Sequence, residues 1–407
     1  MKSLQQTLDQ KAHTQLREPS LQRVKAAFDQ LQIPVDPQKT IVVAGTNGKG
    51  STCNFLRALL QAKGKSVFMH TSPHLKRLNE RFNLNGREAP DELLEKAFDQ
   101  LQIRVSLEPL SHFEILTLMA GIIAFELKTF DYVILEVGLG GLYDATNVFP
   151  HSTSVITPLG MDHLAFLGPT INDVARNKLG IVRENQNVIY QPFPADALPA
   201  LLESKAQHPE NNWIEVLDWS YATDQGPRFF VDYKGCHLEL SQPGHRAAQN
   251  AATALATFES LGFEIGPESK KALKETLWVA RFTPYLFPGM KPKVFLSGDH
   301  NPQGLESLKE ILQHFHWRQL HLIVAIGAGK SFEEQFSSLQ PLPNTHWHLT
   351  QGSFKATPVD SLNENALRPF ELVNPDPSWI LGQLASRLTE DDLVVVTGSL
   401  YMFDRLL

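Results

Sequence analysis

A glycine-rich turn between an apolar run and a helix-like run constrains this chain more than any other feature. Residues 41–44 are apolar, residues 45–52 read GTNGKGST, and apolar side chains then recur at helical spacing from Phe55 to Leu60. Glycines let backbone N–H groups approach an anion, a helix N-terminus attracts negative charge, and Lys49 adds a full positive charge. Gly50 separates Lys49 from Ser51, which departs from the usual P-loop pattern. The stretch predicts a strand, a phosphate-binding loop and a helix, and the alternative is a plain glycine turn.

Length, charge and cysteine content limit the classes of protein that this chain can belong to. Its 407 residues exceed one ordinary core and suit two or three domains. The net charge of −7 and the lack of a long basic tract argue against nucleic acid as the main partner. Two cysteines cannot form a disulfide framework, so a reducing compartment is favoured. The first residues lack the apolar core of a signal peptide, and no apolar run approaches the roughly 18 residues of a membrane helix. We therefore expect a cytoplasmic protein without a membrane partner.

The order of the predicted elements indicates an α/β fold. Predicted strands at 41–44, 66–70, 131–138, 154–157 and 188–190 alternate with helical patterns, which is typical of a mostly parallel sheet covered on both faces. Short strands between about 213 and 240 predict a small antiparallel addition.

A stretch rich in proline, residues 281–293, reads as a linker, and the alternation of strands and helices restarts after it. We expect a large three-layer P-loop domain over residues 1–285. A smaller Rossmann-like α/β domain would occupy residues 286–407.

Several polar residues follow predicted strands, where ligands of parallel sheets bind. Glu136 ends an apolar strand, and a carboxylate there must be paired or bind a metal because an unpaired buried charge is very costly. Mg²⁺ is favoured over a structural salt bridge, since the phosphate loop ends at the same sheet edge. His163 also follows a strand, and its position is equally compatible with a functional role and with a packing role. Ser72 is a loop hydroxyl that says little by itself.

Other candidates have simpler structural explanations beside the functional ones. Lys178 ends a helix, where a lysine is usually a partner of the helix dipole. Arg281 and Asp299 lie on either side of the predicted domain boundary and can meet a ligand in the cleft. Three histidines at positions 314, 316 and 321 resemble a metal cluster, but without a second group of ligands we expect a solvated face.

Taken together, these motifs resemble the Mur ligase superfamily and, more closely, the dihydrofolate synthase/folylpolyglutamate synthase family. The resemblance spans almost the whole chain. The segments that carry it are AGTNGKGS (44–51), TSPHL (71–75), NER (79–81), FE (113–114), LEVGLGG (135–141), DATN (144–147), DH (162–163), QNAA (249–252), RF (281–282), HNP (300–302) and GSLY (398–401). The resemblance implies a P-loop domain of the Mur ligase type and a second domain that closes over the ligands.

The resemblance also implies a reaction. ATP phosphorylates a carboxylate of a pterin substrate, either dihydropteroate or a reduced folate, and the amine of L-glutamate then displaces the phosphate to form an amide. Positioning and charge neutralisation dominate such phosphoryl transfer. Two Mg²⁺ ions would supply part of that neutralisation, and the enzyme would be a monomer.

Individual roles follow from the same resemblance. Nucleotide contacts would come from Thr46, Asn47, Gly48, Lys49, Gly50, Ser51, Asn250, Arg281 and Asp299. Metal ligands would be Ser72, Glu136 and His163. The pterin would lie near Phe113, Glu114 and Asp144, while His300 and Ser399 would place glutamate. Lys49, Lys178 and His300 would be the catalytic residues, with Lys178 carbamylated.

Three departures from the family keep two alternatives open. Ser297 stands where the family has an aspartate, and Asp299 follows two residues later. Residues 327–331 replace an Asp-Lys-Asp motif, and Leu142 replaces an arginine. The alternatives are a ligase of the same architecture for another acid and amino acid, and a catalytically weakened paralogue that binds nucleotide or pterin without turnover.

Overall fold

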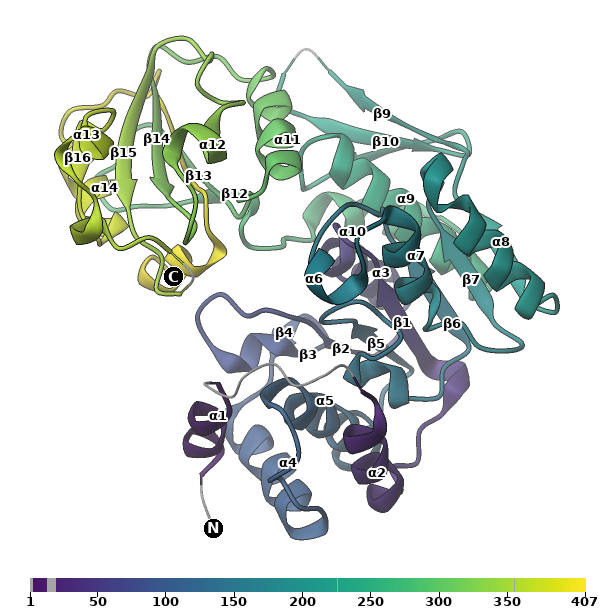
Figure 1. The fold of residues 1–407 in the computed structure, drawn as a ribbon. Helices are drawn as coiled ribbons and strands as arrows, with labels where there is room; N and C mark the ends of the chain where they lie inside the picture. Colours follow the sequence, from purple (N-terminus) through teal and green to yellow (C-terminus); the bar gives the residue numbers. More distant parts are fainter. Residues whose placement is uncertain (1–2, 13–19, 225, 355) are drawn as a thin grey trace.

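Two α/β domains, with a small antiparallel sheet attached to the first, make up the molecule in the computed structural model (Figure 1). The structure describes residues 3–12, 20–224, 226–354 and 356–407. None of the helices in these ranges is both long and apolar enough to cross a membrane. The predicted α/β class is therefore confirmed for both parts of the chain.

The first domain is built on an eight-stranded sheet in the order β4-β3-β2-β5-β1-β6-β7-β8. Its strands are β1 (Thr40–Ala44), β2 (Val67–His70), β3 (Phe82–Leu84), β4 (Arg87–Glu88), β5 (Tyr132–Glu136), β6 (Thr153–Ile156), β7 (Asn187–Tyr190) and β8 (Asn212–Glu215). All neighbours are parallel except in the hairpin β2-β3-β4 at one edge. The chain leaves β1 toward β2 and β5 on one side and later reaches β6 on the other. Ligands of such sheets bind at this reversal point, which lies at the end of β1.

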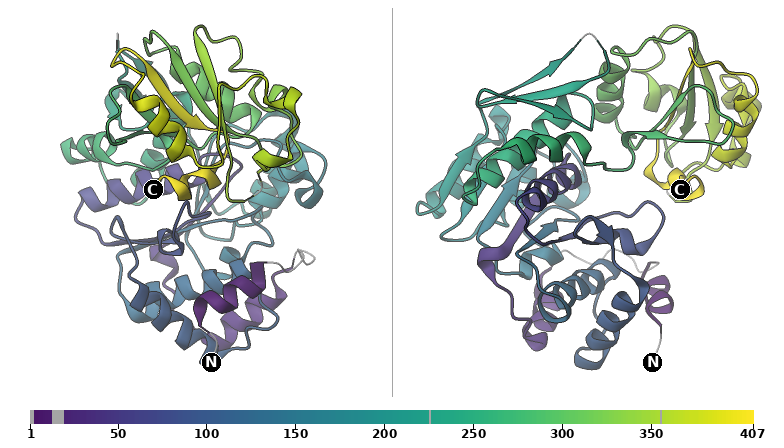
Figure 2. Two further views of the ribbon diagram at one scale, coloured as in Figure 1. Left: turned by 90° about the vertical axis from the view of Figure 1, so that its left-hand side faces the viewer. Right: turned by 180° about the vertical axis from the view of Figure 1, so that it is seen from behind.

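Helices cover both faces of this sheet, so the sheet is the middle of three layers (Figures 1 and 2). The helices of this domain are α1 (Leu4–Ala12), α2 (Gln22–Leu31), α3 (Lys49–Ala62), α4 (Asp91–Arg104), α5 (His112–Ile122), α6 (Leu164–Leu167), α7 (Ile171–Leu179), α8 (Leu198–Gln207), α9 (His245–Ser260) and α10 (Pro267–Glu275). One apolar core joins the sheet to α2, α4, α5, α7 and α8, and a second joins it to α3, α9 and α10. Because both faces are covered, β1 is buried along its whole length, which explains its continuous apolar sequence.

The antiparallel addition is smaller than the sequence predicted. It consists of β9 (Trp219–Thr223), β10 (Phe229–Tyr233) and β11 (Cys236–Leu240). Residues 212–215, part of which we expected there, instead form β8, which pairs in parallel with β7. Alternation of polar and apolar residues does not reveal which sheet an edge strand joins, so this assignment needed the tertiary structure.

The second domain has a six-stranded sheet in the order β12-β13-β17-β14-β15-β16. Its strands are β12 (Arg281–Tyr285), β13 (Lys293–Ser297), β14 (Leu320–Ala325), β15 (Thr345–Thr350), β16 (Leu372–Val373) and β17 (Leu393–Thr397). Its helices are α11 (Pro302–Leu312), α12 (Phe332–Phe336), α13 (Glu364–Leu367) and α14 (Pro377–Ala385). Only β12 runs antiparallel to its neighbour.

Residues 281–285, which we expected in the linker, form β12 and therefore belong to the second sheet. Proline is tolerated in an edge strand, and Pro284 lies in this one. The placement of the domain boundary near 285 remains a prediction, but the chain already pairs with the second sheet at Arg281.

Candidate active site

A cavity of 270 Å³ lies between the two domains at the end of β1. Its walls include the whole predicted phosphate loop from Thr46 to Ser51, together with Ser72, Glu136, His163 and Asn250 of the first domain. Arg281, Asp299 and His300 come from the second domain. Segments that are distant in the sequence thus line one cavity.

The geometry of the loop requires glycine at two positions. Gly45 and Gly48 have φ angles of 147° and 87°, which residues with a side chain rarely adopt. A Cβ atom at Gly45 would lie 1.8 Å from Oγ1 of Thr157, and one at Gly48 would lie 2.0 Å from Oδ1 of Asn250. These close approaches bring the loop against β6 and α9, so Asn250 is held beside the loop.

Lys49 begins α3 and lies on the cavity wall. Its Nζ donates to the carbonyl oxygens of Gly45 (3.2 Å) and Thr46 (3.4 Å), so the ammonium group folds back over the loop. The helix N-terminus and this ammonium group together make the end of the cavity electropositive, which suits an anionic phosphate group.

Glu136 is the buried acid of the site, with 4% of its surface exposed. The backbone N–H of Ser72 donates to its Oε2 at 3.0 Å. Burial raises the pKa of Glu136, while Lys49, the Ser72 N–H, Arg281 and Arg81 oppose that rise. None of the ion pairs in the described ranges includes Glu136, so its carboxylate keeps acceptor capacity toward the cavity.

The oxygen donors at this place fit a hard divalent cation. Ser72 and Glu136 come together through their hydrogen bond and share the cavity wall. His163 lies on the same wall, but its side chain is 53% exposed, and its Nε2 lies 3.7 Å from Oδ2 of Asp162. Within the described ranges there is no cluster of three or more histidine, cysteine, aspartate or glutamate side chains able to hold a metal ion. A hydroxyl and a carboxylate with water and phosphate oxygens match the preference of Mg²⁺.

Lys178 is buried at the back of the loop, with 3% of its surface exposed. Its Nζ donates to the carbonyl oxygen of Gly45 at 2.8 Å. Burial, and secondarily the charge of Lys49, lower the pKa of Lys178 to about 7, against opposing contributions from Asp162 and Asp144. The amine is therefore partly neutral at physiological pH, which a helix-end lysine in solvent would not be.

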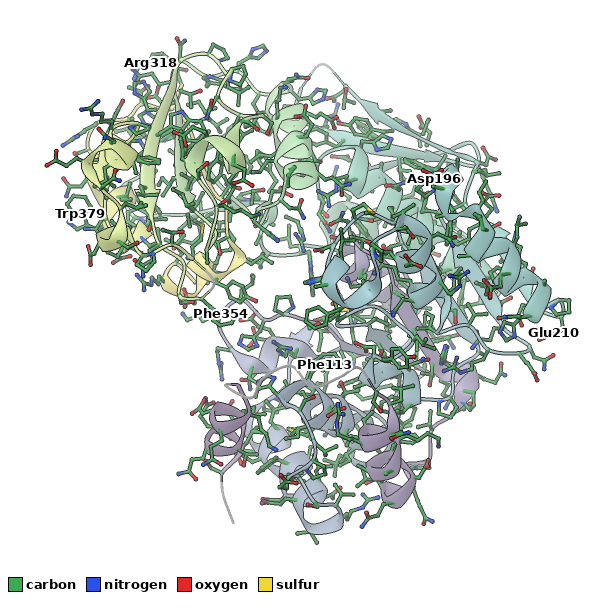
Figure 3. All side chains as sticks on the ribbon, in the orientation of Figure 1. Phe113, Asp196, Glu210, Arg318, Phe354 and Trp379 are labelled. Carbon is green, nitrogen blue, oxygen red and sulfur yellow. The ribbon has the colours of Figure 1, made fainter. Side chains whose placement is uncertain are left out.

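Phe113 and Asp144, which were predicted to lie near the pterin, adjoin the loop after β5 and do not line the cavity between the domains. The ring of Phe113 packs against Gly138, where a Cβ atom would lie 2.7 Å away, and Figure 3 shows Phe113 in the first domain. Asp144 is buried and accepts hydrogen bonds from the N–H groups of Leu139 and Thr146. These two residues thus adjoin the same loop from different sides.

Glu114 and Ser399 have structural partners where the structure places them. Glu114 caps α5 by accepting from the backbone N–H of Ser111 at 2.6 Å, and it pairs with Arg23 at 3.3 Å. Ser399 accepts from the backbone N–H of Tyr401 at 3.2 Å and begins a 3₁₀ turn. Neither contact tests the predicted substrate role.

A larger cavity of 510 Å³ adjoins the first and was not predicted. The two share Gly50, Ser72, Pro73, Glu136 and Arg281 on their walls. Apolar side chains at 277–279 form part of its lining, and so do basic side chains at positions 57, 76 and 77.

Sequence reasoning also missed cavity residues that lie outside the motifs. Gln242 and Arg246 line the first cavity, and Gln303 lines an adjoining cavity of 180 Å³. The spacing of Arg246 and Asn250 by one helical turn places both on one face of α9 and was a usable signal. No sequence signal marks Gln242, which precedes the helix.

A phosphate loop on a parallel sheet, facing a second α/β domain across a cavity, is the arrangement of the Mur ligase class. Residues 43–258, more than half of the chain, match the Mur ligase middle domain family. The chain is 31% identical to "Dihydrofolate synthase/folylpolyglutamate synthase" of Bacillus subtilis (strain 168), over 94% of this chain and 93% of that protein. The protein accordingly belongs to the dihydrofolate synthase/folylpolyglutamate synthase family of Mur ligases.

Two further comparisons describe the range of this family. A relative from Lacticaseibacillus casei, named "Folylpolyglutamate synthase" alone, is 29% identical over 93% of this chain and 92% of its own length. A crystal structure of a bifunctional folylpolyglutamate synthase/dihydrofolate synthase with Mn, AMPPNP and L-glutamate bound has a TM-score of 0.82 at 26% identity, covering 100% of this chain and 97% of that one.

Proposed function

We propose that this protein is an ATP-dependent ligase that joins L-glutamate to a pterin carboxylate through an acyl phosphate. The observation that carries the proposal is the convergence of Lys49, Glu136 and Asp299 on one interdomain cavity. In this cavity Lys49 would bind phosphate and the carboxylate of Glu136 would bind a metal ion, while Asp299 belongs to the wall that the second domain contributes. The family relatives, named for dihydrofolate and folylpolyglutamate synthesis, support the same reaction.

In this proposal the phosphates of ATP lie on the loop, where Lys49 and the N-terminus of α3 neutralise their charge. Ser72 and Glu136 would hold Mg²⁺, with His163 available on the same wall, and two ions are proposed. Bound Mg²⁺ supplies charge neutralisation at the transferring phosphoryl group. The acid substrate would reach the reacting centre through the larger cavity, which meets the first at Ser72 and Glu136.

Closure of the second domain would protect the acyl phosphate, because water in the site would hydrolyse it. His300 lines the cavity from that domain, and its Nδ1 lies 2.8 Å from the carbonyl oxygen of Gly298. We propose that His300 and Ser399 place the incoming glutamate. We also propose that the enzyme acts as a monomer.

Phosphate release from purified protein with ATP, Mg²⁺, L-glutamate and dihydropteroate tests the proposal. We expect release that requires all four components, and a second assay with tetrahydrofolate distinguishes a monofunctional from a bifunctional enzyme. Lys49→Ala serves as the inactive control. Nucleotide binding without release in either assay would support the weakened paralogue, and release with another acid or amino acid would support the alternative ligase.

A further inference from the structure

Arg57, on the third turn of α3, carries a positive charge that no acid of the described residues neutralises. Its hydrogen bonds go to neutral groups: Nε and Nη2 donate to Oδ1 of Asn54, Nη2 also donates to Oγ1 of Thr276, and Nη1 donates to Oε1 of Gln61. A guanidinium group has five N–H donors, so about one remains free. A half-buried cation without an acid is costly unless a ligand supplies the negative charge.

This side chain lines the 510 Å³ cavity that joins the proposed reacting centre. Lys76 lines the same cavity and takes part in no ion pair within the described ranges, whereas Arg77 pairs with Asp91 at 3.1 Å. Two unpaired cations on one cavity wall attract an anionic ligand that extends away from the reacting centre.

The acids on the same wall do not neutralise Arg57. The carboxylate of Glu80 accepts hydrogen bonds from the backbone N–H groups at positions 75, 76 and 77, so it is occupied by the turn to which it belongs. Glu88 lies exposed on the edge strand β4. Neither acid forms an ion pair with Arg57 in the part of the chain that the structure describes.

Apolar side chains lie beside these cations. Leu277 and Val279 line the cavity although 62% and 44% of their surfaces are exposed. Trp278 lies between them in the sequence, and its indole Nε1 lies 3.3 Å from the point that a Cβ atom of Gly50 would occupy. A ligand that fits this wall has carboxylates for the cations and hydrocarbon links for the apolar strip.

A chain of glutamates linked through their γ-carboxyl groups has this chemistry, because each residue keeps a free α-carboxylate and two methylene groups. Arg57 follows Gly50, where the two cavities meet, by roughly 10 Å along the axis of α3. With the terminal γ-carboxyl group at the reacting centre, the α-carbon of that glutamate lies about 4 Å away and that of the next glutamate about 10 Å away. The second α-carboxylate therefore matches the position of Arg57.

We propose that Arg57 binds the α-carboxylate of the second glutamate, counted from the reacting end, of a γ-glutamyl chain on the acid substrate. The inference rests on the proposed function and adds a selection for chain length. Dihydropteroate has no carboxylate besides the reacting one, and a folate with a single glutamate has one too close to the reacting centre. The preferred acid is thus a reduced folate that already carries at least two glutamates.

Equilibrium binding of tetrahydrofolates with one, two or three γ-linked glutamates, measured by calorimetry with ADP and Mg²⁺ present, tests this proposal. An ionic hydrogen bond contributes enough that the parent protein should bind the diglutamate roughly 10-fold more tightly than the monoglutamate. Arg57→Ala should lower this ratio to about two or less and leave the affinity for the monoglutamate unchanged. Arg57→Lys, which keeps the charge without the planar fork, should give an intermediate ratio. In turnover, Arg57→Ala should raise KM for the diglutamate and leave kcat unchanged.

Lys63 at the end of α3 provides a matched control, since it pairs with Glu268 and does not line the cavity. Lys63→Ala removes the same charge from the same helix and should keep the parent ratio. Arg57→Gln, which keeps polar contacts for its neighbours, replaces Arg57→Ala if that variant does not fold. Equal binding of one and two glutamates by the parent, or a folded Arg57→Ala or Arg57→Gln variant with the parent ratio, would overturn the proposal. Because binding with ADP needs no turnover, missing ligase activity alone would overturn only the proposed function.

Discussion

The backbone N–H of Ser72 donates a 3.0 Å hydrogen bond to Oε2 of Glu136, which joins the loop after β2 to the end of β5. The bond partly satisfies a carboxylate whose pKa burial raises. It leaves the hydroxyl of Ser72 and the second carboxylate oxygen beside the phosphate loop. Burying a carboxylate without an ion pair lowers the stability of the fold. A binding site for a divalent cation, in contrast, needs such a carboxylate as a ligand.

Replacing Glu136 should therefore weaken metal use without weakening the fold. We expect Glu136→Gln to raise the Mg²⁺ concentration for half-maximal activity at least roughly 10-fold. The melting temperature should stay level or rise, because the neutral amide avoids the cost of burying a charge. Mg²⁺ titration of activity and thermal unfolding measure the two effects.

Glu126→Gln is the matched control, since Glu126 pairs with Arg104 away from the cavity. It should leave the Mg²⁺ dependence unchanged. A parent-like Mg²⁺ dependence of Glu136→Gln would remove Glu136 from the metal site.

A methyl group on the phosphate loop should block nucleotide binding through a clash as well as through backbone strain. Gly48→Ala places its Cβ 2.0 Å from Asn250, at a φ of 87°. We expect a loss of stability of about 1–3 kcal/mol and loss of measurable ADP binding. Gly64 separates the two causes, because it has a φ of 74° but no atom within 4 Å of the point that a Cβ would occupy. Gly64→Ala should cost about 1 kcal/mol and leave ADP binding intact. Normal ADP binding by Gly48→Ala would contradict the loop assignment.

The low pKa of Lys178, about 7, has a chemical consequence. A neutral amine reacts with CO₂ to form a carbamate and release a proton, and the lowered pKa of Lys178 makes the neutral amine available near pH 7. We expect a carbamate signal in ¹³C NMR spectra recorded with ¹³C-bicarbonate. Lys178→Ala should lose the signal and reduce kcat roughly 10–100-fold.

Lys205, whose Nζ contacts the hydroxyl of Tyr190, serves as the comparison. Lys205→Ala should keep both the carbamate signal and the activity. A parent protein without a carbamate signal at pH 7–8 would rule out the modification.

Two buried histidines of the second sheet should make the protein sensitive to acid. Nδ1 of His321 lies 3.0 Å from Nε2 of His348, and burial lowers the pKa of each to about 4, with a smaller contribution from neighbouring histidines. In the unfolded chain both bind protons near pH 6.5, so stability is present above that pH and is lost as the pH falls from 6.5 to 4. The loss should be on the order of 2 kcal/mol per histidine.

Chemical denaturation between pH 4 and 7 measures this dependence. The charged groups around the pair, Asp392, Glu371, Arg318, Arg387 and His346, stay in place in a His321→Leu/His348→Leu variant. The variant should show a flatter pH dependence. An unchanged slope would mean that other buried histidines, such as His151, dominate the acid response.

Local patterns predicted much of the first domain and much of the cavity. The loop at 45–52 follows an apolar strand and Glu136 ends another, and β-α-β order brings strand ends to one sheet edge.

Our expectation for His321 was wrong, because its side chain is buried within β14, with 4% of the residue exposed, and does not lie on a solvated face. A histidine beside a helix pattern and one inside a strand differ little in sequence, and burial depends on what packs above them.

The sequence defined the glycine-rich loop between β1 and α3, because glycine conformation and a helix start are local properties of neighbouring residues. It also determined the α/β class through the spacing of apolar residues. The packing of the whole chain, and no local pattern, places β12 in the second sheet and brings Arg246 to Asp299. Contacts between distant segments depend on how whole elements pack, and that packing is the sum of many weak interactions that no local pattern records.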